Sequence, residues 1–372
     1  MTNIAKIKDI DWVLFICVIL LATVGFVMQF SVAGGSFTPW AIKHGIRFLL
    51  AILLMFTIAI IDIRFWYKWA WIFFAFSILL LIYVEFFGHI GMGAKRWIDL
   101  KIFKLQPSEL VKIFLILALA KYYTSISQYK ISSFKSVFFI LVVLLIPAGL
   151  VYRQPDLGTA ILIILGGLSV AFLAGLSWKW ILCGISLITL VVPSVLSLVL
   201  RPYQQKRITT FLDPESDPLG KGYHIIQSKI AIGSGGMTGQ GLVQGRQTQL
   251  GFLPENHTDF IFTVIAEELG FIGSMSVLLL ILFILYKILI ISHNVYSAFA
   301  KLVVMGMGVT FFLYVLINVG MVMGLFPVVG VPLPLISYGG TVMITTMVGF
   351  GFIQNMWVHR RIENPSVDIE YY

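Results

Sequence analysis

The chain has 372 residues, of which 59% are hydrophobic and only 12% are charged, and its mean hydropathy is +0.96. Soluble domains carry about 25% charged residues, so this chain has too few polar side chains to cover a surface exposed to water. Its formal net charge of +9 is compatible with topology signals, contact with anionic membrane lipids or an anionic substrate. No basic face interleaved with aromatic residues is found, which argues against nucleic acid as a partner. The composition predicts a polytopic α-helical membrane protein.

Ten stretches are apolar enough to cross a bilayer, which takes about 20 residues each. They are residues 12–33, 45–61, 66–87, 107–123, 136–152, 157–174, 179–200, 260–286, 300–325 and 336–357. The first apolar run is too long for a cleaved signal peptide, so we expect it to remain as the first helix. The predicted fold class is an all-α polytopic integral membrane protein with ten transmembrane helices, forming a single membrane domain over residues 1–372.

An even number of spans puts both termini on the same side of the membrane. With the termini in the cytoplasm, fewer than half of the 26 Lys and Arg residues lie on the inner side, so charge alone gives an ambiguous topology. The inner segments contain few acids, however, and the outer basic residues cluster at 95–112 and 201–246, where a function can explain them. We therefore expect both termini in the cytoplasm.

Residues 201–259 form the longest polar interruption, a large extracytoplasmic loop between spans 7 and 8. Within it, Tyr223 to Ile232 has the pattern of a short amphipathic helix that stops at Gly233. The glycine-rich segment 233–245 predicts tight turns or a close approach to a ligand, with a flexible linker as the alternative. A shorter polar stretch, residues 87–110, predicts a structured hairpin or an interfacial segment.

Spans 4, 6 and 8 all begin on the same membrane face, and each start carries an acid, namely Glu109, Asp156 and Asp259. Such acids can simply stabilise a helix N-terminus, by about 0.3–1 kcal/mol each. Lys112 follows Glu109 by one turn, however, and Arg153 lies close to Asp156. A lysine in lipid costs at least about 2.5 kcal/mol, so Lys112 needs an acid or an anionic ligand nearby. We expect a shared polar pocket.

Span 8 also contains the adjacent acids Glu267 and Glu268. Glu267 lies on roughly the same helix face as Asp259. A structural contact with a neighbouring helix and a direct role in the site are equally open for Glu267.

Several motifs together resemble one family. They are PYQQKRITTFLDPESDPLGKGYHIIQSKIAIGSGG, FLPENHTDFIFTVIAEELGFIG, RWIDL, LQPSEL, RQPDLGTA and PLPLISYGG. Taken in their order along the chain, from the first span to the last, they resemble the SEDS family of shape, elongation, division and sporulation proteins. The stretch GYHIIQSKIAIGSGG is more similar to the elongation members than to the division members.

The resemblance implies a peptidoglycan glycosyltransferase that polymerises lipid II into glycan strands during cell elongation. It implies a multi-pass protein of the bacterial cytoplasmic (inner) membrane that acts with a class B penicillin-binding protein, a transpeptidase. The essential aspartate of the family corresponds to Asp259. The glutamate and lysine of its QPSExxK-like motif correspond to Glu109 and Lys112, and the aspartate of its QPDLG motif corresponds to Asp156.

The chemistry of lipid II polymerisation fits these residue types. The acceptor hydroxyl must lose a proton, and a carboxylate such as Asp259 can act as the general base, a step that contributes about 10²–10⁴-fold. Positive charge should stabilise the leaving pyrophosphate. The candidate substrate-binding residues are Glu109, Lys112, Asp156, Arg153, Lys206, Arg207, Glu255 and His257. No cofactor is assigned with certainty, and a divalent cation, Mg²⁺ or Mn²⁺, is an alternative source of that charge.

One expectation complicates the role of Asp259 as a base. If Lys112 were paired with Asp259, it would lower the pKa of the aspartate and make the aspartate a weaker base.

Two other functions stay open. Charged residues inside a many-span bundle often mark a transport path, which suits a flippase or transporter of lipid II. Transporters frequently contain inverted repeats, and no convincing repeat relates the two halves of this chain. A non-catalytic scaffold that docks a transpeptidase is the second alternative.

Overall fold

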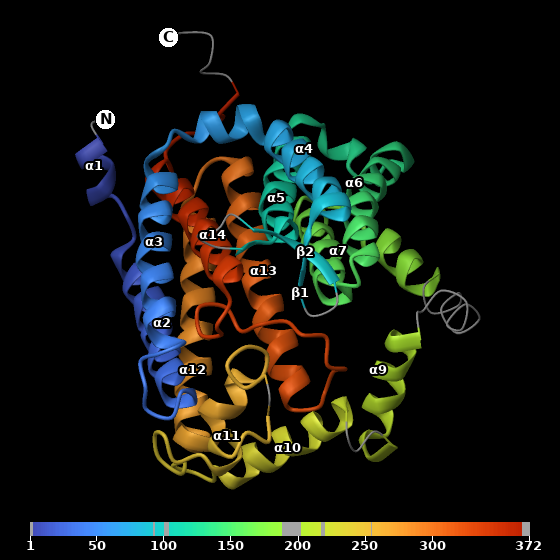
Figure 1. Ribbon diagram of the computed structural model, residues 1–372. Helices are drawn as coiled ribbons and strands as arrows, with labels where there is room; N and C mark the ends of the chain where they lie inside the picture. Colours follow the sequence, from blue (N-terminus) through green and yellow to red (C-terminus); the bar gives the residue numbers. More distant parts are fainter. Residues whose placement is uncertain are drawn as a thin grey trace.

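The computed structural model describes residues 3–91, 94–99, 104–187, 202–216, 220–253 and 255–366. Long helices run between the two ends of the molecule (Figure 1). They are α2 (Trp12–Val32), α3 (Ala41–Ile60), α4 (Ile63–Phe87), α5 (Pro107–Ser125), α6 (Phe134–Arg153), α7 (Leu157–Leu173), α12 (Ile261–Asn294), α13 (Ala298–Val322) and α14 (Gly340–Val358).

Seven helices in the described part of the chain are long and apolar enough to cross a membrane: α2, α3, α4, α6, α12, α13 and α14. Helix α7 is shorter, with 17 residues, and α5 carries charges at Glu109, Lys112 and Lys121. The seventh predicted span begins as a helix over Trp178–Leu187, and its remainder lies outside the described residues. The predicted helical membrane fold is confirmed, whereas the count of ten spans stays a prediction.

The helices begin where the sequence supplies capping groups. Asp11 Oδ1 accepts a hydrogen bond of 2.8 Å from the amide of Leu14 at the start of α2. Asp62 caps α4 in the same way. Helix α5 instead starts with Pro107, which has no amide hydrogen to leave unsatisfied. A side-chain cap such as Asp11 or Asp62 contributes typically about 1 kcal/mol.

Helix α13 lies at the centre of the bundle and packs against α5, α7, α12 and α14. Helix α14 also packs against α3, α12 against α2, α4 against α5, and α6 against α7. Peripheral helices expose large apolar side chains such as Leu49 of α3 and Phe86 of α4, as expected for surfaces that face lipid tails. The charged starts of α5 and α12 are thereby held against a buried central helix.

A small antiparallel sheet precedes α5 and contains β1 (His89–Gly91), β2 (Ala94–Asp99) and β3 (Lys104–Leu105). Strand β2 is the middle strand, with Ala94 opposite Gly91 of β1 and Asp99 opposite Lys104 of β3. The structured hairpin predicted for this stretch is confirmed. The other regular elements of the described residues are helices.

The loop between the seventh predicted span and α12 folds into α9 (Pro202–Leu212), a 3₁₀ turn (Pro214–Ser216), α10 (Lys221–Ser234) and α11 (Arg246–Gln249). Helix α10 confirms the predicted amphipathic helix, and it runs one residue past Gly233. It packs against α12. Helices α10 and α11 lie at the opposite end of the bundle from α1 (Asn3–Lys8) (Figure 1).

Both ends of the described chain meet at the α1 end of the bundle. Arg360, just after α14, forms an ion pair of 3.4 Å with Asp9, just after α1, and Gln354 donates a hydrogen bond of 2.9 Å to the carbonyl of Asp11. These contacts bring both described ends of the chain together, and the cytoplasmic location of the termini stays a prediction.

Helix α12 is broken at Gly270, where φ is 67° and ψ is −163°. The glycine-rich segment fills the break: the amide of Phe271 donates to the carbonyl of Gly236 at 2.9 Å. A Cβ on Gly239 would lie only 2.1 Å from the carbonyl oxygen of Glu268, so a side chain there is excluded. The predicted close approach of these glycines is therefore to the backbone of the chain's own helix, and the segment is not a flexible linker.

Candidate functional site

A cavity of about 790 Å³ lies at the starts of α5, α7, α12 and α14. Among the described residues, its walls carry five acidic and four basic side chains: Asp99, Glu109, Asp156, Glu255, Asp259, Arg47, Arg96, Lys104 and Arg207. The predicted polar pocket shared by Glu109, Asp156 and Asp259 is confirmed. Three helices that are far apart in the sequence bring their first turns together here.

Asp259 reaches this cavity from the last turn before α12. The N-cap of α12 is Phe260, and no side chain caps the helix, so helix capping does not explain Asp259. Its carboxylate faces Gly330, which has a φ of 75°, and a Cβ on Gly330 would lie 3.0 Å from Oδ2 of Asp259. Gly330 belongs to the segment between α13 and α14, residues 323–339, called the α13–α14 loop below. This loop leaves room for the carboxylate because it has no side chain at that position.

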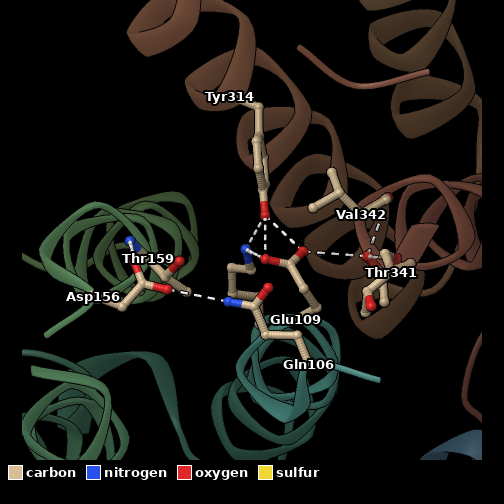
Figure 2. Close-up of polar contacts among 9 residues, drawn as sticks. Gln106, Glu109, Asp156, Thr159, Tyr314, Thr341 and Val342 are labelled. Carbon is tan, nitrogen blue, oxygen red and sulfur yellow. Dashed lines mark hydrogen bonds and ion pairs between the residues drawn. The ribbon is translucent and has the colours of Figure 1, made fainter. Parts of the chain in front are cut away.

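Asp156 both caps α7 and lines the cavity. Its Oδ1 accepts a hydrogen bond of 3.2 Å from the amide of Thr159, as the capping alternative predicted. Its Oδ2 accepts a second bond of 3.1 Å from Nε2 of Gln106 (Figure 2). The carboxylate thus ties the start of α7 to the start of α5.

Glu109 and Lys112 form a buried ion pair of 2.6 Å, and each side chain is only 4% exposed. The hydroxyl of Tyr314 donates to the Glu109 carboxylate, at 2.8 Å from Oε1 and 2.7 Å from Oε2 (Figure 2). Lys112 Nζ also contacts the Tyr314 hydroxyl, and Thr345 Oγ1 lies 3.2 Å from Glu109 Oε2. Lys112 has the nearby acid that its burial requires.

The ion-pair partner of Lys112 is Glu109 and not Asp259. The complication considered for Asp259, a pKa lowered by pairing with Lys112, therefore does not arise from this ion pair. Lys112 itself lines a smaller cavity of about 40 Å³, whose walls include the apolar side chains of Met307, Phe311 and Phe350. Glu109 lines both cavities. The ion pair therefore separates the polar cavity from an apolar region between α5, α13 and α14.

Besides Asp259, the large loop contributes two predicted substrate-binding residues to the cavity, Arg207 from α9 and Glu255. Oε2 of Glu255 accepts a hydrogen bond of 2.8 Å from Oγ1 of Thr258. Lys206 lies on α9 as well, but its side chain is outside the part of the chain that the structure describes.

Three of the described candidate residues do not line this cavity: Lys112, which lines the smaller cavity instead, Arg153 and His257. The side chain of Arg153 is 69% exposed and lies 3.5 Å from Glu85. His257 stacks on Trp40 with 4.2 Å between the ring centroids. Burial lowers the pKa of His257, while Glu255 raises it by a smaller amount.

Glu267 makes the structural contact that was one of its two alternatives. Its Oε1 accepts a hydrogen bond of 2.7 Å from the amide of Gln247, and Oε2 accepts from the amide and the hydroxyl of Thr248 at 3.1 and 2.7 Å. Glu268 turns to the other side and accepts a bond of 2.5 Å from Ser31 of α2. The two acids anchor the loop and α2 to α12.

Several cavity residues were missed by the sequence analysis. Arg47 of α3 lies over the ring of Tyr338, 4.7 Å from its centroid, and Nε of Arg96 donates to the carbonyl of Gln154 at 2.9 Å. An arginine at the start of an apolar span was a usable signal for Arg47, because charges in spans are rare and functional. Tyr314 had no such signal, since a tyrosine in an apolar helix is ordinary.

Metal binding has no assigned residues. Within the described residues, no group of three or more His, Cys, Asp or Glu side chains is placed to hold a metal ion. The alternative of Mg²⁺ or Mn²⁺ stays a prediction.

The chain is similar to known proteins over nearly its whole length. Peptidoglycan glycosyltransferase MrdB of Escherichia coli K12 is 45% identical over 318 residues, which cover 86% of this chain and 85% of that protein. A solved chain from a peptidoglycan synthase complex that coordinates polymerization and crosslinking is 32% identical, with a TM-score of 0.83 and coverage of 95% and 98%. The crystal structure of rod shape determining protein RodA from Thermus thermophilus is 26% identical, with a TM-score of 0.72 and coverage of 95% and 98%.

A family model described as a cell cycle protein, FtsW/RodA/SpoVE, matches residues 11–362. This match confirms the resemblance that the motifs indicated. It covers the helices that form the cavity. The chain therefore belongs to the FtsW/RodA/SpoVE family, the SEDS family of cell cycle proteins.

Proposed function

We propose that this protein polymerises lipid II into glycan strands during cell elongation, with Asp259 as the general base for the acceptor sugar hydroxyl. The activity class follows from the family and its relatives: the chain is a peptidoglycan glycosyltransferase. The observation that carries the role of Asp259 is its position in a cavity of about 790 Å³ that is also lined by cationic side chains.

The two kinds of charge match the two ends of the reaction. The acceptor hydroxyl attacks the anomeric carbon and gives its proton to a carboxylate, while the bond to the pyrophosphate breaks and negative charge develops on the leaving group. Arg47, Arg96, Lys104 and Arg207 line the cavity, and their positive charge would stabilise the leaving group. Because Lys112 pairs with Glu109, it does not compete with the acceptor for Asp259.

The membrane placement follows from the same cavity. Lipid II carries its sugars outside the membrane, so we propose that the cavity faces the outer side of the bacterial inner membrane and that both termini lie in the cytoplasm. The bundle supports this arrangement because α1 lies at the end opposite α10 and α11 (Figure 1), and Asp9, just after α1, pairs with Arg360.

We further propose a class B penicillin-binding protein as the partner. The similar chain of known structure comes from a peptidoglycan synthase complex that coordinates polymerization and crosslinking. A transpeptidase held beside this chain would receive each new glycan strand as it leaves the cavity.

The break in α12 argues against a transport function. Broken helices in transporters often present free backbone groups to a substrate. Here Phe271 and Ile272 donate their amides to the carbonyls of Gly236 and Met237 at 2.9 and 3.1 Å. The break thus holds a loop of the chain itself.

The test is lipid II polymerisation by the purified full-length protein with a class B penicillin-binding protein. Glycan strands should form with the wild type, and the Asp259→Asn and Asp259→Ala variants should lose about 10²–10⁴-fold of the rate. The matched control is Asp62→Asn, because Asp62 caps α4 at the other end of the bundle.

Three results would contradict the proposal. Normal strand formation by Asp259→Ala would remove Asp259 from the chemistry. Translocation of lipid II across liposomes by the wild type without any polymer would favour the flippase function, and a partner activated equally by Asp259→Ala would favour the scaffold.

A further inference from the structure

Three consecutive backbone carbonyls end at Asp259, and each accepts a hydrogen bond from a buried side chain of a different element. Gln29 of α2 donates to His257 O at 3.0 Å, and Ser337 of the α13–α14 loop donates to Thr258 O at 2.6 Å. Asn318 of α13 donates to Asp259 O at 2.9 Å. The chain entering α12 is therefore held residue by residue up to the carboxylate.

The same three side chains also bind the α13–α14 loop. Nε2 of Gln29 donates to Ile336 O at 3.1 Å, and Nδ2 of Asn318 donates to Val331 O at 2.7 Å. Oγ of Ser337 accepts from the amide of Leu333 at 2.7 Å. We call Gln29, Asn318 and Ser337 the carbonyl clamp, because together they join residues 257–259 to residues 331–337.

Burial makes these bonds hard to replace. Gln29 and Asn318 are 0% exposed and Ser337 is 3% exposed, so water does not compete with the carbonyls for these donor groups. Each amide nitrogen uses both of its hydrogens on backbone carbonyls, and the serine hydroxyl donates once and accepts once. Removing one of these donors breaks a link between the two segments, and residues 257–259 can then shift relative to the α13–α14 loop.

The carbonyl clamp holds two parts of the chain that border the Asp259 carboxylate. One is its own backbone. The other is Gly330, next to the Val331 carbonyl that Asn318 binds, where a Cβ would lie 3.0 Å from Oδ2 of Asp259. A change in the clamp therefore moves the carboxylate and the wall that it faces relative to each other.

We infer that Gln29, Asn318 and Ser337 are positioning residues, which hold Asp259 at the geometry needed for proton transfer. The inference rests on the proposed role of Asp259 as the general base. A misplacement of about 1 Å can reduce a rate by about 10²-fold while leaving substrate binding intact. The clamp should therefore act on kcat more than on KM.

The experiment compares Asn318→Ala with Asn355→Ala. Asn355 is also 0% exposed and donates to backbone carbonyls, Ile58 O at 2.8 Å and Ala59 O at 3.2 Å, but it lies near the α1 end of the bundle. Both variants should lower Tm by similar amounts in detergent. Only Asn318→Ala should lower the kcat of lipid II polymerisation, by about 10–100-fold, with KM changed by less than about twofold.

A second pair covers the case in which Asn318→Ala does not fold. Ser337→Ala removes only a hydroxyl, and its control is Ser77→Ala, since Ser77 is 0% exposed and donates to Phe74 O at 2.7 Å within α4. Ser337→Ala should lower kcat by about tenfold or more, and Ser77→Ala should leave it unchanged.

The outcomes separate this inference from the proposed function. The inference is overturned if the clamp variants keep the kcat of their controls, or if they change KM while kcat stays normal, when Asp259→Ala is inactive in the same assay. If Asp259→Ala itself polymerises lipid II at the normal rate, the proposed function fails, and the clamp then has no base to position.

Discussion

Tyr314 and Asn318 lie one helical turn apart on α13 and hold the two charged sides of the cavity. The Tyr314 hydroxyl donates to Glu109 at 2.7 Å, and the Asn318 amide donates to the carbonyl of Asp259 at 2.9 Å. Residues four apart share a helix face, so a single face of α13 sets the distance between the start of α5 and the start of α12. Helix α13 thus fixes the spacing between these two sides of the cavity.

Tyr314→Phe should destabilise the protein, because Glu109 loses a buried hydrogen bond to its carboxylate. The expected loss is about 1–3 kcal/mol, measured as a lower Tm of the purified protein in detergent. The control is Tyr123→Phe: Tyr123 is 4% exposed, and its hydroxyl has no hydrogen-bond partner among the described residues. A Tyr314→Phe protein as stable as Tyr123→Phe would contradict the bonding shown in Figure 2.

Glu109 and Lys112 should behave as one unit. Removing either charge alone, by Glu109→Gln or Lys112→Met, leaves the other buried and should cost about 3–5 kcal/mol. The double variant should be clearly more stable than the sum of the two single effects predicts. Thermal unfolding of the three variants measures the coupling, and strict additivity would mean that the pair does not interact.

Gly330→Ala should impair catalysis through the Asp259 carboxylate. The new Cβ would lie 3.0 Å from Oδ2 of Asp259, and the φ of 75° is unfavourable for alanine. We expect a loss of at least about tenfold in the polymerisation rate. Gly149→Ala is the matched control, because that helical glycine has nothing within 4 Å of its Cβ position. Equal activity of the two variants would show that the carboxylate does not need the space at Gly330.

Glu267→Gln should loosen the segment that contains α11. Its carboxylate accepts three hydrogen bonds from Gln247 and Thr248, and an amide can retain only part of them. Limited trypsin digestion should then cut after the neighbouring Arg246 several times faster than in the wild type. The control, Glu363→Gln, changes an exposed acid in the C-terminal segment after α14. Unchanged cleavage would mean that other contacts hold the segment.

His257 should make stability depend on pH. Burial lowers its pKa below the usual value of 6.5, so the unfolded chain takes up a proton at a higher pH than the folded chain. Its contribution to stability is therefore complete above about pH 6.5 and is lost as the pH falls through the lowered pKa of the folded protein. His257→Phe keeps an aromatic ring on Trp40 and removes the titration. The fall in Tm between pH 7 and pH 5 should be smaller in this variant than in the exposed control His293→Gln, and an equal fall would contradict it.

Local chemistry made much of this protein predictable. Apolar runs with capping groups or a proline at their starts define the helices, and the positions of Glu109, Asp156 and Asp259 at helix starts on one face indicated a shared pocket. The helices depend on residues that are close in sequence. The shared face depends on the even number of membrane crossings between one acid and the next. The buried Lys112 likewise required a partner, and the partner was Glu109, one turn away.

Long-range contacts decided the rest, because they depend on how the helices turn and pack. Arg153, three residues before the α7 N-cap, lies near Glu85 and does not line the cavity, while Arg47 comes in from a helix more than 200 residues from Asp259. Gln29, Ser337 and Tyr314 look like ordinary polar residues of spans and loops in the sequence. Only the tertiary structure shows that they bind the backbone before α12 and the carboxylate of Glu109, since a hydrogen bond across the bundle leaves no local pattern.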